Sequence, residues 1–107
     1  KVEENSHEIK KRIVKARNIQ LQRYKDIGIM TNSELTTKSL SKFCKVNKES
    51  EILLRNAFEV LGLSVRAYNK ILKVARTIAD LESYENIETK HIAEAIQYRS
   101  LDRKYWR

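Results

Sequence analysis

The chain has 107 residues, of which 41% are apolar, so it has room for one modest core, and we expect a single helical domain over 1–107. Two glycines, no proline and 34% charged residues favour helices joined by short loops, so we predict an all-α fold. No apolar run approaches the roughly 20 residues that a membrane span needs, and we expect a cytoplasmic protein without a membrane partner. The net charge of +8 favours an anionic partner.

The first predicted helix begins at the N-cap Asn5 and runs to about Lys25, with Gly28 as its stop. Its apolar face is formed by Ile9, Ile13, Ala16 and Tyr24. Arg17 and Gln20 fall inside this apolar arc, and we expect their polar heads to bond neighbouring helix ends. A nucleotide or DNA contact of these two side chains is the alternative.

Residues 28–36 lack periodicity and are predicted to form a loop. A short helix over Thr37–Lys45 follows, anchored by apolar residues that include Phe43. Asn47 is the expected N-cap of a third helix, which runs to Leu61. Its apolar face should pack on the central helix, and comprises Leu54, Ala57, Phe58 and Leu61.

The central helix, over 64–82, organises the rest of the chain. Gly62 suits the left-handed residue that ends the helix before it, and Ser64 suits its N-cap. About half of its circumference is apolar and should form the core: Tyr68, Ile71, Leu72, Val74, Ala75, Ile78, Ala79 and Leu81. The opposite arc carries Arg66, Lys70 and Lys73 at spacings of four and three.

Arg66 is disfavoured twice by local electrostatics. It repels Lys70 one turn away, and it lies in the first helical turn, where the dipole is positive and an acidic residue is preferred. However, a helix N-terminus with an added guanidinium can hold a phosphate, because free N–H groups and a five-donor fork converge there. A merely solvated basic face is the alternative interpretation.

Residues 82–88 are predicted to be a connector, with Ile87 as an apolar plug. Thr89 is the expected N-cap of a last helix through about Arg99. Its buried side should comprise Ile92, Ala93, Ala95 and Ile96. The segment 100–107, with Tyr105 and Trp106, is predicted to be a mobile or docking tail.

The sequence predicts no catalytic or metal site within this chain. Two histidines and one cysteine assemble no convincing nucleophilic or metal-ligand arrangement. Cys44 follows Phe43 at an apolar position, which indicates a buried free thiol in a reducing compartment. His7 and His91 each lie in a first helical turn, where we expect solvent-facing or local hydrogen-bonding roles.

Several strings resemble the C-terminal domain of magnesium-chelatase-like AAA+ ATPases of the ComM/YifB type. They are Arg12-Ile-Val-Lys-Ala-Arg-Asn-Ile-Gln-Leu-Gln-Arg-Tyr24, Phe43-Cys44, Leu63-Ser-Val-Arg-Ala-Tyr68, Val74-Ala-Arg-Thr-Ile-Ala-Asp-Leu81 and His91-Ile-Ala-Glu-Ala-Ile-Gln-Tyr-Arg99. In that family the region is a helical lid after the nucleotide-binding core, so the resemblance implies a lid-like bundle of four main helices and one short one. The parent proteins are bacterial ATPases linked to DNA processing during natural transformation.

By the same likeness Arg66 occupies the place of the sensor-2 arginine, which reaches the γ-phosphate of ATP held by the core. Lys70 and Lys73 would be secondary anion contacts. The Walker A, Walker B and arginine-finger segments are not in this sequence, so the chain alone is expected to be neither an enzyme nor a cofactor-binding protein. ATP and Mg²⁺ belong to the parent protein, whose expected partners are its own core, neighbouring ring subunits and DNA, whereas the isolated chain is expected to be a monomer.

The chief alternative is an autonomous DNA-binding module. The corner at 62–64 superficially resembles a helix-turn-helix, whose second helix would present Arg66, Asn69, Lys70 and Lys73 to a groove. A protein-docking domain that uses the Tyr105-Trp106 tail is a third possibility. A groove reader should bind short duplex DNA alone, with a steep salt dependence and some sequence preference, whereas a lid should bind it only weakly and without sequence preference.

Overall fold

A computed structural model of the chain describes residues 5–101, and every regular element in that range is helical. The elements are α1 (Ser6–Arg23), the 3₁₀ turn η1 (Asn32–Glu34), α2 (Thr37–Phe43), α3 (Lys48–Leu61), α4 (Val65–Leu81) and α5 (Thr89–Leu101). The all-α prediction of a small bundle with four main helices and one short helix is therefore confirmed.

Four helices begin at a side-chain cap, as helices with unpaired first-turn N–H groups require. Asn5, Asn47 and Ser64 accept bonds from the backbone N–H three residues later, as predicted, and Thr36 does the same for α2. Gly62, with φ of 62°, ends α3 in the left-handed conformation that favours glycine.

Some predicted boundaries are wrong. The helix α1 ends at Arg23 and α2 ends at Phe43, each two residues early, and η1 forms inside the predicted loop. Thr89 is not the N-cap of α5 but its first residue, and its hydroxyl bonds Ser50 of α3 at 3.0 Å. The helix α5 extends to Leu101, and the rest of the predicted tail, with Tyr105 and Trp106, lies outside the described residues.

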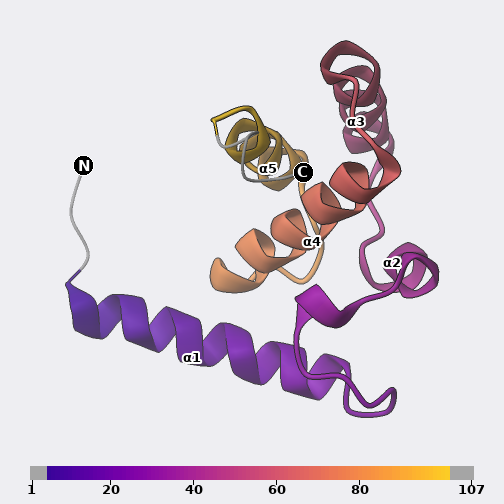
Figure 1. Cartoon of the computed structure of the whole chain (residues 1–107). Coiled ribbons are helices and arrows are strands. Elements are labelled where there is room, and N and C mark those ends of the chain that lie inside the picture. Colours follow the sequence, from indigo (N-terminus) through magenta and orange to yellow (C-terminus); the bar gives the residue numbers. More distant parts are fainter. Residues whose placement is uncertain (1–4, 102–107) are drawn as a thin grey trace.

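The helix α4 lies in the middle of the bundle and contacts α1, η1, α2 and α5 (Figure 1). Its predicted apolar arc is buried or half-buried throughout. Together with residues from α2, α3 and α5 and with Tyr24, directly after α1, it forms one core, whose fully buried members include Tyr24, Leu54, Ile71 and Ile92. The core prediction for α4 is therefore confirmed.

Two packing predictions need correction. The main partner of α3 is α5 rather than α4, and an edge-to-face contact between Phe58 and Tyr68 connects α3 to α4. In α5, Ala93 is exposed, because the buried stripe runs through Ile92 and Ala95 instead.

The apolar face of α1 is buried only in its C-terminal half. Ala16 and Tyr24 belong to the core, whereas Ile9 and Ile13 remain 40% exposed, contrary to the predicted buried face. In Figure 1 the N-terminal part of α1 extends along the edge of the bundle. None of the described helices is long and apolar enough to cross a membrane.

We expect Ile71→Ala to lower the free energy of unfolding by roughly 2–5 kcal/mol, because it empties a completely buried site on the central helix. Urea denaturation followed by circular dichroism measures this. Val60→Ala is the control: this side chain is 82% exposed, and the change should stay within about 0.5 kcal/mol. A loss for Ile71→Ala below about 1 kcal/mol would contradict the core assignment.

Candidate functional site

Arg66 is the second residue of α4, two positions after the N-cap Ser64. The Ser64 hydroxyl accepts the N–H of Ala67 at 3.1 Å, which leaves the N–H groups of Val65 and Arg66 without a partner inside the helix. The Arg66 side chain is exposed, and within residues 5–101 it forms no hydrogen bond or ion pair. The first turn of α4 thus offers backbone N–H donors and a guanidinium that bond no other described residue of the chain.

Lys70 and Lys73 lie on the same side of α4 and line one pocket together with Arg66. The pocket has a volume of about 880 Å³, and its opposite wall comes from η1 and α2, including Ser33, Thr36 and Thr37. Lys73 donates from Nζ to the Ser33 carbonyl at 3.2 Å, and Asn69 donates to the Thr37 hydroxyl at 3.1 Å. The structure therefore brings the three predicted basic residues together, but Lys73 also holds the wall of the pocket.

A buried polar network fixes the other end of α4. The Asp80 carboxylate accepts two bonds from the Arg23 guanidinium, at 2.6 and 3.0 Å, and one from the Asn32 amide at 3.0 Å. Asn32 uses its remaining groups as well: its Oδ1 accepts from Arg23 and Tyr24, and its backbone N–H donates to Gln20. The network thereby connects α1, η1 and α4.

Arg76 is the second guanidinium at Asp80. Its Nη2 lies 3.2 Å from Asp80 Oδ1 and 3.0 Å from the Tyr84 carbonyl oxygen, to which it donates. Burial lowers the pKa of Arg76, and the attraction of Asp80 offsets only part of that effect. Burial also acts to lower the pKa of Arg23, but the hydrogen bonds to Asp80 and Tyr24 outweigh it and raise that pKa. One carboxylate therefore balances two buried cations.

His91 is completely buried, and of the two roles predicted for it, facing solvent or bonding locally, the structure shows local hydrogen bonding. Its Nδ1 accepts the N–H of Glu88, the residue directly before α5, at 2.9 Å. Its Nε2 lies 3.1 Å from Glu82 Oε1, which makes Nε2 the donor in the neutral ring. His91 is a structural residue at the junction of α4 and α5.

Arg66, Lys70 and Lys73 are predictable from the sequence, whereas the network around Asp80 was not predicted. A signal was present, since Arg76 and Asp80 interrupt the apolar side of the central helix at a spacing of four, where a buried ion pair fits. The expectation for Gln20 is confirmed by its bond to Asn32, while Arg17 is exposed and bonds no other described residue. Among residues 5–101, no group of three or more His, Cys, Asp or Glu side chains could hold a metal ion.

Cys44 is a buried thiol, as predicted, and burial raises its pKa from the ordinary 9.0 to about 11. The folded state therefore disfavours the thiolate that the unfolded chain forms readily. The associated stability is fully present below pH 9 and is lost as the pH rises toward about 11.

We expect the free energy of unfolding to decrease between pH 9 and about 11 and to do so less steeply in Cys44→Ala. The difference isolates the thiol from Tyr24, whose pKa burial also raises. Urea denaturation at a series of pH values measures both slopes. Parallel slopes in the two proteins would contradict the assignment of the raised pKa to Cys44.

Replacing Asp80 with Asn should lower the free energy of unfolding by roughly 3 kcal/mol or more, because two buried guanidinium groups lose their counter-ion. Chemical denaturation provides the measurement. Glu85→Gln removes the same charge at an exposed position and should change stability by less than about 0.5 kcal/mol. Similar losses in the two variants would show that Asp80 does not hold the helices together.

The sequence comparisons agree with this arrangement. The family model described as magnesium chelatase, subunit ChlI C-terminal, matches residues 3–99. The competence protein ComM of Haemophilus influenzae is 42% identical over 100 residues, and the YifB proteins of Salmonella typhimurium and Escherichia coli are each 38% identical over the same length. These alignments cover 94% of the chain but 19% of each relative, so the chain spans about a fifth of their length. The chain belongs to the magnesium chelatase subunit ChlI C-terminal family, as the C-terminal domain of the ComM/YifB type.

Proposed function

We propose that this chain is the helical lid of an AAA+ ATPase and that Arg66 senses the nucleotide held by the core. The observation that carries the proposal is the position of Arg66: an exposed guanidinium in the first turn of α4, beside N–H groups that have no helical partner. A cation at this end of a helix opposes the dipole, and an outside phosphate would relieve that conflict.

The residues present suit a phosphate group. The Arg66 fork can form two parallel bonds to phosphate oxygens, and the α4 N-terminus adds backbone donors. Lys70 and Lys73, one and two turns along the pocket, are the proposed secondary anion contacts. ATP and Mg²⁺ would be held by the core, which lies outside this chain, so Arg66 stabilises charge on the γ-phosphate while the chain alone turns over nothing.

The partners of the chain and the role of the parent protein are inferred from the family membership and are part of the proposal. The proposed partners are the ATPase core of the same protein and neighbouring subunits of a ring in the cytoplasm. One relative is named a competence protein, which favours a role in DNA processing for the parent. On this proposal the lid reports nucleotide state and leaves catalysis to the core.

The lid accounts for the basic row on α4 better than a DNA-reading helix does. A recognition helix needs one face open along its length, with side chains free to reach base edges. Instead, Lys73 is bonded to Ser33, Asn69 is bonded to Thr37, and their side of α4 faces the pocket wall formed by η1 and α2. The N-terminal turn with Arg66 remains open to an outside ligand.

We expect Arg66→Ala to leave folding intact and to damage turnover in the full-length protein. Stability of the 107-residue chain should change by less than about 0.5 kcal/mol, because the substitution removes an exposed cation that repels Lys70. The ATPase rate of the full-length protein should fall at least about tenfold, because charge on the transferred phosphoryl group loses a donor. Denaturation and steady-state phosphate release measure the two effects.

Arg17→Ala serves as the control, since it removes an exposed arginine from α1 that lines neither pocket. It should leave the ATPase rate unchanged. Normal turnover in the Arg66→Ala protein, or unfolding of the isolated variant, would mean that Arg66 is a structural or merely solvated residue.

A further inference from the structure

The positive charge of the chain is concentrated on its first helix. Residues 6–25 contain seven of the 22 basic residues and one of the 14 acidic residues, a net charge of +6, whereas the rest of the chain carries only +2. Like charges this close on a helix repel by a few tenths of a kcal/mol per pair. The proposed role of Arg66 uses none of this charge.

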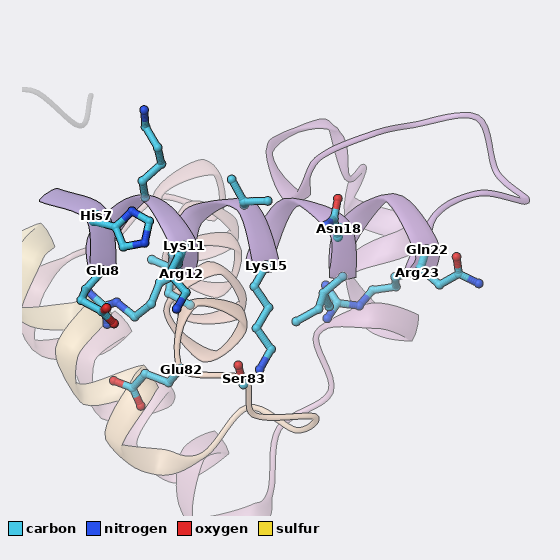
Figure 2. Close-up of a pocket in the computed structure, with 14 residues that line it drawn as sticks. His7, Glu8, Lys11, Arg12, Lys15, Asn18, Gln22, Arg23, Glu82 and Ser83 are labelled. Carbon is cyan, nitrogen blue, oxygen red and sulfur yellow. The ribbon is translucent and has the colours of Figure 1, made fainter.

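The basic helix forms one wall of a long open groove. The groove has a volume of about 1270 Å³, and its other wall is the end of α4 with the turn at Leu81, Glu82 and Ser83. Figure 2 shows Lys11 and Lys15 reaching from α1 toward that turn. This volume exceeds the range of about 300–1000 Å³ that is usual for small-molecule sites, which favours an extended ligand.

The groove presents a continuous row of polar side chains. Helical spacing places His7, Lys11, Lys15, Asn18 and Gln22 along one side of α1, over a length of about 22 Å. All five can donate hydrogen bonds. In the part of the chain that the structure describes, neither Lys11 nor Lys15 forms an ion pair.

The acidic groups along the groove do not neutralise this row. Glu82 lies opposite, but its Oε1 is 3.1 Å from His91 Nε2 and 3.6 Å from Lys90 Nζ, so α5 already partners it. Glu8 lies in the first turn of α1, where its charge complements the helix dipole. The centre of the groove therefore keeps the charge of Lys11 and Lys15.

We propose that the groove between α1 and the 81–83 turn binds the sugar–phosphate backbone of nucleic acid without reading its sequence. Evenly spaced cations and amide donors match a regular line of phosphates, which attract Lys, Asn and Gln side chains but carry no sequence information. No Phe, Tyr or Trp side chain lines the groove, and single strands are usually held by bases stacked on such rings. Duplex DNA is therefore the favoured form.

The lysine content of the groove disfavours a protein partner. Protein interfaces are depleted of lysine at their centre, whereas Lys10, Lys11 and Lys15 line this groove. The nucleic-acid proposal is independent of Arg66, because the groove and the pocket beside Arg66 share only Leu81 among their lining residues. Failure of either proposal leaves the other standing.

The test is binding of a fluorescently labelled 20-base-pair duplex to the 107-residue chain, followed by anisotropy over a salt series. We expect the duplex to bind more tightly than a single strand of the same length and to bind equally well after its sequence is scrambled. Lys11→Gln combined with Lys15→Gln should weaken binding at least about tenfold and lower the salt slope by about 2, as loss of two phosphate contacts requires. Circular dichroism confirms that the variant is folded.

Lys45→Gln combined with Lys48→Gln is the matched control, because it removes the same charge from exposed positions on another part of the chain. It should change affinity less than twofold. Equal losses in both double variants would overturn the proposal in favour of unspecific charge attraction. The proposal also fails if an acidic peptide of equal charge competes as well as the duplex, if the single strand binds more tightly, or if Arg66→Gln with Lys70→Gln weakens binding while the α1 variant does not.

Discussion

The Asp80 carboxylate is the interaction on which the arrangement of the helices depends. It is buried beneath two guanidinium groups and an amide, and these partners come from α1, η1 and α4. Burying charge is costly, and an apolar cluster of equal volume often stabilises a protein as well or better. What the network adds is direction: the bidentate bond from Arg23 fixes the angle and register at which α1 meets α4. Apolar contacts alone would tolerate sliding between these helices.

This network and the candidate nucleotide site are parts of one continuous structure. Asn32 donates to Thr77 on α4, and the next residue, Ser33, accepts from Lys73 one turn nearer to Arg66. The turn η1 is therefore held by α4 at both the buried network and the pocket. An anion that drew Lys73 toward Arg66 would compete with the Ser33 carbonyl, and the pocket wall would respond. The candidate nucleotide site and the buried network that fixes the helices therefore both depend on α4.

Sequence reasoning succeeded where local rules decide the outcome. The caps at Asn5, Asn47 and Ser64 and the stop at Gly62 depend on neighbouring backbone groups alone, so the residue types predict them. It failed where distant segments meet. Asp80 reads as a charge at the end of a helix until Arg23, 57 residues earlier, arrives opposite it. The burial of His91 could not be predicted either, because it depends on how α5 packs beside Glu82, directly after α4. Arg66 was identified because its conflict with the dipole is visible locally, whereas the charged groove requires α1 to lie next to the turn at Ser83.

The one-sided attachment of α1 has a mechanical consequence. The helix has 18 residues and is therefore about 27 Å long, and its deepest attachments, through Gln20, Arg23 and Tyr24, are all near its C-terminal end. The helix is therefore attached at Asp80, while its N-terminal part lines the groove. A tilt of about 10° at Asp80 would displace the far end by about 5 Å, the pitch of one helical turn. A small rotation about Asp80 would thus move the groove-lining end of α1 far more than it moves the buried network.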